Sequence, residues 1–191
     1  MKKILVSNFK HYHKDNGVKI ANSFDNSNGI IDDIKKSLNK TNTIVFIPSD
    51  PENEDMVELY SSLLFEGLKL SGIIFDNYLI LDMNNISNAE EYIKKADMIF
   101  LSGGSTYSQC EYFKSFNLKE LISFFDGLVV GQSAGAINMA NDAYNSPTDM
   151  EESEPIYLEG LGIVDFNIEP HFVYDSSNDL KVLTTLKSLQ V

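Results

Sequence analysis

Short, uninterrupted runs of apolar residues alternate along the chain with longer amphipathic segments. The runs are rich in β-branched side chains, which is typical of strands buried on both faces. The predicted strands are residues 4–6, 43–47, 78–81, 98–101 and 128–130. Helical spacing occurs near 28–39, between Pro51 and Gly72, from Ser87 onward, across 105–125, over 136–140 and over 180–189, while 141–160 reads as a long polar loop. This alternation predicts an α/β fold: a mostly parallel sheet with helices on both faces, in three layers.

The length of the chain indicates its domain organisation, and its charge limits its binding partners. The 191 residues predict a single domain over 1–191, with no metal or disulfide needed for folding. The net charge is -13, and every basic side chain is a lysine. We therefore expect no nucleic acid and no membrane as partner, because both carry negative charge. No signal peptide or membrane span is recognisable, and Cys110 is the single cysteine. These features predict a cytoplasmic protein.

The strongest chemical signal is Gly131-x-Ser133-x-Gly135, which directly follows a predicted strand and precedes a predicted helix. A serine on such a sharp turn is held in a strained conformation that exposes its hydroxyl. Flanking glycines are needed where the two arms of the turn approach closely. Three fixed positions can also arise by chance, but the placement between strand and helix favours a nucleophile at Ser133.

A serine nucleophile needs a base, and the chain has three histidines. His11 and His13 lie in a lysine-rich segment, where solvated surface histidines are the expected interpretation and a metal pair is the alternative. His171 follows Glu169-Pro170 at a predicted strand end. Ligands gather at the carboxyl ends of parallel strands, where Ser133 is also expected. His171 is therefore the candidate base, with a purely structural histidine as the alternative.

Gly103-Gly104 ends the fourth predicted strand. Two glycines there allow the backbone to approach a ligand, and their N–H groups could form an oxyanion hole with the N–H group of Ala134. A plain turn is the alternative. Cys110, a few residues further on, is expected to serve in packing.

Taken together, Leu101-Ser102-Gly103-Gly104, Gly131-Gln132-Ser133-Ala134-Gly135 and Pro170-His171-Phe172 resemble the serine peptidases that include aspartyl dipeptidase (peptidase E) and cyanophycinase. The three motifs occur in the family's order, and the resemblance covers essentially the whole chain. It implies a fold like that of class I glutamine amidotransferase domains. It also implies Ser133 as nucleophile, His171 as base, and Gly104 with Ala134 as oxyanion donors.

The acid that orients the imidazole is less well defined by this resemblance. In the family, an aspartate in the loop after the nucleophile has this role, and Asp149 matches its place. A glutamate well beyond the histidine has also been assigned it, and the chain ends at Val191 before such a residue. The chain is thus expected to be a form shortened at its C-terminus, to use Asp149, or to be catalytically impaired. Asp175 and Asp179 are explained more simply as helix caps or solvated residues.

The resulting expectation is a serine-type peptidase of the dipeptidase kind, acting on small peptides through an acyl-enzyme and needing no cofactor or metal. A catalytically impaired binding homologue and an esterase or amidase with the same serine turn are the alternatives. An N-terminal aspartate in the substrate would call for a cation, which only a lysine could supply here, as a point charge. The oligomeric state is left open, a homodimer being one option.

Overall fold

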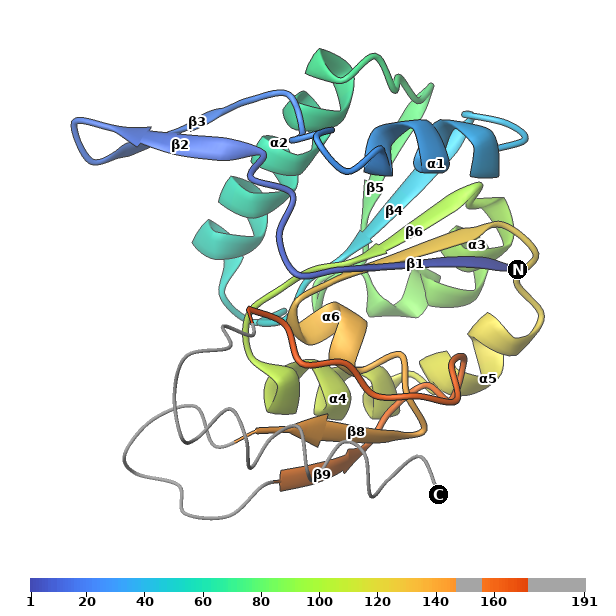
Figure 1. The fold of residues 1–191 in the computed structure, drawn as a ribbon. Helices are drawn as coiled ribbons and strands as arrows, with labels where there is room; N and C mark the ends of the chain where they lie inside the picture. Colours follow the sequence, from blue (N-terminus) through green and yellow to red (C-terminus); the bar gives the residue numbers. More distant parts are fainter. Residues whose placement is uncertain (147–155, 172–191) are drawn as a thin grey trace.

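The computed structural model describes residues 1–146 and 156–171. Its centre is a five-stranded sheet in which all neighbouring strands are parallel (Figure 1). In spatial order the strands are β1 (Lys2–Val6), β7 (Leu128–Gln132), β6 (Met98–Leu101), β4 (Thr43–Ile47) and β5 (Asn77–Ile80). The five strands predicted from apolar runs are thus confirmed.

Helices cover both faces of this sheet (Figure 1). One face carries α1 (Ile30–Ser37) and α2 (Glu54–Leu70). The other carries α3 (Ala89–Lys95) after the short 3-10 helix η1 (Ile86–Asn88), α4 (Thr106–Ser115), α5 (Leu118–Ser123) and α6 (Ala134–Ile137). Each face has its own apolar core, and every residue of β4 and β6 is buried between them. The predicted three-layer α/β architecture is confirmed.

The strand register brings the candidate motifs to one edge of the sheet. Gly131 of β7 pairs with Leu5 of β1 on one side and with Leu101 of β6 on the other. Because the three strands are parallel, the residues that follow each of them leave the sheet at the same edge. Ser102-Gly103 after β6 and Ser133 after β7 are therefore neighbours, although about thirty residues separate them in sequence.

Two hairpins were not predicted. The segment after β1, expected to be a polar stretch, forms β2 (Tyr12–Asp15) and β3 (Val18–Ala21). Its turn, Asn16-Gly17, has positive φ at both residues, the geometry that suits a two-residue hairpin. The prediction of a loop over 141–160 is wrong in part, since β8 (Asp142–Asn145) pairs with β9 (Ile156–Glu159). The predicted helix over 180–189 lies outside the described residues.

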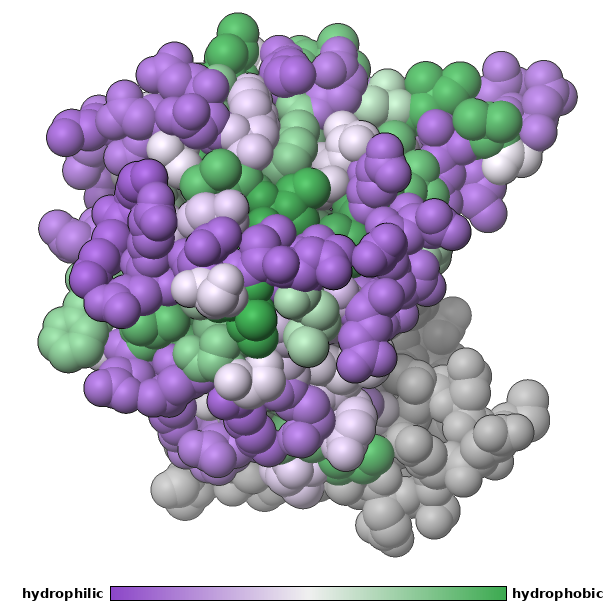
Figure 2. Space-filling view, turned by 180° about the vertical axis from the view of Figure 1, so that it is seen from behind, coloured by the Kyte–Doolittle hydropathy of each residue, from purple (hydrophilic) through white to green (hydrophobic). Residues whose placement is uncertain are grey.

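Much of the surface is hydrophilic. Figure 2 shows hydrophilic side chains over most of one face, with hydrophobic ones gathered in smaller patches, some of them on the projecting β2–β3 hairpin. Val18 and Ile20 of that hairpin are exposed. Among residues 1–146 and 156–171, no helix combines the length and the apolar character required to cross a membrane.

Candidate active site

Ser133 stands at a sharp turn between β7 and α6. Its backbone has φ 49° and ψ -113°, an unusual conformation for a residue with a side chain. The Ser133 N–H group donates to the Val6 carbonyl at 2.8 Å, which fixes the turn to the end of β1. The Ser133 carbonyl accepts from the N–H groups of Ala136 and Ile137, so α6 starts at once. The predicted serine turn is present. The helix after it was predicted over 136–140, but α6 begins two residues earlier, at Ala134, and has four residues, so its dipole is small.

The glycines on either side of Ser133 are required by close packing. A Cβ atom on Gly131 would lie 2.7 Å from the Gly135 carbonyl oxygen, and one on Gly135 would lie 2.2 Å from the Leu101 carbonyl oxygen. These neighbours are backbone atoms, which cannot move aside without shifting the strands. The two arms of the turn therefore need glycine, as predicted from the sequence.

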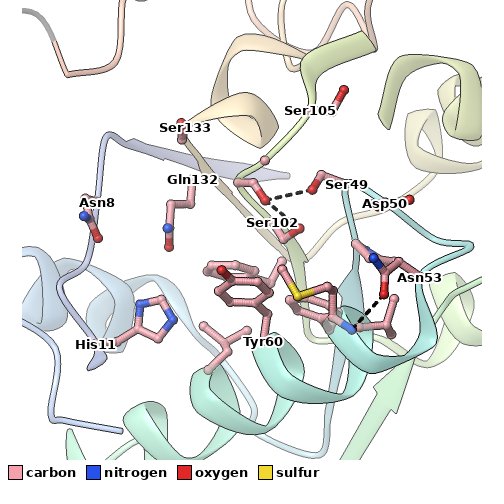
Figure 3. A pocket seen from close by; sticks show the side chains of 18 of the residues that line it. Asn8, His11, Ser49, Asp50, Asn53, Tyr60, Ser102, Ser105, Gln132 and Ser133 are labelled. Atoms are coloured by element: carbon pink, nitrogen blue, oxygen red, sulfur yellow. Dashed lines mark hydrogen bonds between the residues drawn. The ribbon is translucent and has the colours of Figure 1, made fainter. Parts of the chain in front are cut away.

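Gly103-Gly104 lies against this turn. A Cβ atom on Gly103 would be 3.2 Å from Cβ of Ser133, and Gly104 has φ 138°, which side-chain-bearing residues rarely adopt. Ser49, at the end of β4, donates from its hydroxyl to the Gly103 carbonyl at 2.8 Å (Figure 3). Ser49 thus holds the glycine pair in place, a role that the sequence did not reveal.

His171 completes the cluster. Its Nε2 lies 3.2 Å from the Ser133 hydroxyl oxygen, within hydrogen-bonding reach. His171 lies in a turn with φ 62°, not at a strand end as predicted. Its N–H group donates to the Ser7 hydroxyl at 3.3 Å, and Glu169 accepts a hydrogen bond from Ser146 at 2.7 Å. These contacts anchor the segment that carries the imidazole to β1 and to the end of β8.

A buried polar network supports α6 from behind. The side chain of Asn138 donates to the Thr106 carbonyl and to the Gln109 side chain, and it accepts from the Cys110 thiol at 3.0 Å. Gln109 in turn donates to the Ser102 carbonyl, just before the glycine pair. Burial raises the pKa of Cys110 to about 11, so its thiol stays protonated at neutral pH. Cys110 serves in packing, as expected, and the network ties the serine turn to α4.

Three aspartates were considered from the sequence as the acid beside His171. Asp149, Asp175 and Asp179 all lie outside the described residues. Within residues 1–146 and 156–171, no carboxylate makes a hydrogen bond to the imidazole of His171. Over those same residues, His, Cys, Asp and Glu side chains form no group of three that could hold a metal ion.

A pocket of about 440 Å³ opens beside Ser133 and His171 and extends to α2 (Figure 3). His11 lies in its wall and is 4% exposed, so the prediction of a solvated surface histidine is wrong for this residue. His11 lies just before β2, where its ring contacts that of Phe24 and its Cβ packs against Gly67 of α2. His13, which lies in β2 itself, is exposed as predicted, and its Nδ1 forms a hydrogen bond with the Asn22 side chain.

Burial of His11 makes stability depend on pH. Desolvation lowers the pKa of His11 from 6.5 to about 4, so the unfolded chain binds more protons between these values. The free energy of unfolding should be fully retained above pH 6.5 and fall by about 3 kcal/mol as the pH drops to 4. Urea unfolding of the wild type and of His11→Phe between pH 4 and 6.5 measures this dependence of the free energy of unfolding on pH. His13→Gln is the matched control and should keep the wild-type slope of the free energy of unfolding against pH. If His11→Phe had the same slope as the wild type, the pH dependence could not come from His11.

Comparison with known proteins identifies the family. The model of peptidase family S51 matches residues 19–188. The chain is 26% identical over 153 residues to a Drosophila melanogaster protein named "Probable alpha-aspartyl dipeptidase", and this match covers 78% of the chain and 60% of the relative. It is 32% identical over 124 residues to a peptidase E of Shewanella sp. (strain W3-18-1), covering 56% of the chain and 51% of the relative. The chain thus spans about half to three fifths of these relatives.

A crystal structure agrees on the fold. A peptidase E candidate from Listeria monocytogenes EGD-e superposes with a TM-score of 0.64 at 20% identity, covering 96% of this chain and 86% of that one. The family match covers most of the chain and includes the Ser133 turn and His171. The chain therefore belongs to peptidase family S51.

Proposed function

We propose that this protein is a serine peptidase of the dipeptidase type that hydrolyses small peptides. The observation that carries the proposal is the 3.2 Å separation between the Ser133 hydroxyl oxygen and His171 Nε2, on a strained turn beside a glycine pair. A nucleophile and its base require such a separation, which supports the proposal. The family membership and the dipeptidase names of the relatives support the same activity.

In the proposed mechanism, Ser133 Oγ attacks the scissile carbonyl while His171 Nε2 accepts its proton. The oxyanion is stabilised by the N–H groups of Gly104 and of Ala134, which as the first residue of α6 has no intrahelical partner for its N–H group. His171 then protonates the leaving amine. Water, deprotonated by the same imidazole, hydrolyses the acyl-enzyme. Asp149 is the proposed acid that orients the imidazole, and the cytoplasm is the proposed compartment.

A substrate panel tests the activity. The purified protein is incubated with dipeptides and, in parallel, with 4-nitrophenyl acetate, and the released amino acids and nitrophenol are measured. The proposal predicts dipeptide hydrolysis. Ester hydrolysis without peptide hydrolysis would point to an esterase instead, and no turnover of either would point to the catalytically impaired homologue.

The glycine pair gives a second test of the proposed oxyanion site. Gly104→Ala places a Cβ atom 2.1 Å from the Ser49 hydroxyl oxygen and imposes a strained φ, so the loop must shift. We expect kcat/KM to fall about 100-fold or more, as when an oxyanion donor is lost. The double variant Gly104→Ala/Ser49→Gly relieves the collision but not the strained φ, and should recover part of the loss. Wild-type kcat/KM in Gly104→Ala would exclude this loop from the reaction.

A further inference from the structure

The pocket beside Ser133 has two chemically different walls. One is apolar and is formed by β4, β6 and α2. Its side chains are Phe46, Met56, Val57, Tyr60, Leu64 and Phe100. The other wall is polar and carries Asn8, His11 and Gln132, which Figure 3 shows gathered on one side of the pocket. We call these three residues the amide wall. Ser133 and His171 also line the pocket, so a side chain bound here lies next to the proposed reacting groups.

The described lining of the pocket offers no positive charge. None of the lysines among residues 1–146 and 156–171 lines it, whereas Asp50 does. Lys19 is near, but its ammonium group donates to the Tyr60 hydroxyl and lies 4.0 Å from the centroid of the Tyr60 ring and 5.2 Å from that of Tyr12. A carboxylate entering this pocket would lose its hydration without gaining a free counter-charge from the described lining, which is costly.

The amide wall carries polar atoms that lack a partner. His11 Nδ1 and Gln132 Oε1 are buried and make no hydrogen bond within the described residues. A buried polar atom without a partner costs free energy, so both favour a ligand that can satisfy them. His11 is neutral at pH 7, because burial lowers its pKa to about 4, and a neutral imidazole has one donor and one acceptor nitrogen. The wall can therefore accept and donate hydrogen bonds without carrying charge.

We infer that this pocket binds an uncharged, amide-bearing side chain, that of an N-terminal asparagine or glutamine, in preference to a carboxylate. An amide has an NH₂ donor for Gln132 Oε1 and a carbonyl acceptor for a ring N–H of His11, and its methylene stem packs against the apolar wall. A carboxylate offers acceptors only. An aliphatic side chain fits the apolar wall but leaves both polar atoms without partners. The inference rests on the proposed peptidase function and specifies its substrate.

Matched dipeptides test this inference. The kcat/KM values of the wild type are measured for Asn-Leu, Asp-Leu and Leu-Leu, and Ser133 is treated with a fluorophosphonate in parallel. We expect kcat/KM for Asn-Leu to be at least about 30-fold higher than for Asp-Leu and about 10-fold higher than for Leu-Leu. These are the effects expected when one or two buried polar groups lose their partners. If Ser133 reacts with the fluorophosphonate and Asp-Leu is hydrolysed as fast as Asn-Leu, this inference is overturned while the proposed peptidase function stands. An inert Ser133 without turnover would remove the proposed function as well.

Variants of the wall locate the preference. Gln132→Met keeps the length of the side chain but removes the amide, and His11→Phe removes the imidazole. Each variant should lower the ratio of kcat/KM for Asn-Leu to kcat/KM for Leu-Leu about 10-fold. General damage to the protein would lower both values and leave this ratio unchanged. Lys19→Met is the matched control and should leave the Asn-Leu to Asp-Leu ratio unchanged. A selective loss of Asp-Leu hydrolysis in Lys19→Met would assign the pocket a cation and contradict the inference.

Discussion

Replacing Ser133 by alanine is expected to lower kcat for dipeptide hydrolysis at least about 10⁴-fold. The variant removes only the Oγ atom, which lies 3.2 Å from His171 Nε2 and is the proposed nucleophile. The strained turn depends on the backbone and on the flanking glycines, so the free energy of unfolding should change by less than about 1 kcal/mol. Steady-state kinetics and urea unfolding on the same preparation measure both quantities.

A matched serine variant controls for general effects of the substitution. Ser123 is on α5, away from the pocket lining, and its hydroxyl donates to the Glu120 carbonyl at an exposed position. Ser123→Ala should retain the wild-type kcat. If Ser133→Ala kept more than a tenth of the wild-type kcat, Ser133 could not be the nucleophile.

The second large effect concerns stability. Gly135→Ala places a Cβ atom 2.2 Å from the Leu101 carbonyl oxygen and 2.6 Å from its carbonyl carbon. This collision is relieved only if α6 moves away from the end of β6, which would disrupt its close packing and the buried polar network that joins it to α4. We expect the free energy of unfolding to fall by about 3 kcal/mol or more, as in severe overpacking.

Gly17→Ala is the control for Gly135→Ala. Gly17 also has positive φ, at 86°, but a Cβ atom there would meet nothing within 4 Å. In Gly17→Ala the free energy of unfolding should fall by about 1 kcal/mol, because of the backbone conformation alone. Urea unfolding of both variants compares them directly. A loss in Gly135→Ala no larger than that in Gly17→Ala would show that the turn tolerates a side chain, contrary to the packing described above.

The sheet could be predicted from the sequence because its strands contain short, continuous apolar runs, and the central strands β4, β6 and β7 are almost entirely buried. Apart from Thr43, β4 and β6 are apolar throughout, and runs of four or five such residues are too short for a typical buried helix. Once the strands are parallel, the residues after β6 and β7 must share one edge, which is why Gly103 and Ser133 could be expected to meet. The match of His171 to Ser133 relied further on the resemblance to a known family.

Other features depend on contacts that no local pattern records. His11 is in a polar, lysine-rich segment, and only its packing against Phe24 and α2 buries it. The Asn16-Gly17 turn was a usable signal for that hairpin. Ser49 and Gln132 look like ordinary polar residues at strand ends, and their roles follow from a hydrogen bond to Gly103 and a position in the pocket wall.

The most direct test of the account is the reactivity of Ser133 itself. The wild type and His171→Gln are treated with a fluorophosphonate, and the modified residue is located and its rate of modification measured by mass spectrometry. We expect modification at Ser133, slowed at least about 100-fold in His171→Gln, because the imidazole accepts the proton of the hydroxyl group. Modification of a different serine, or an equal rate at Ser133 in both proteins, would contradict it.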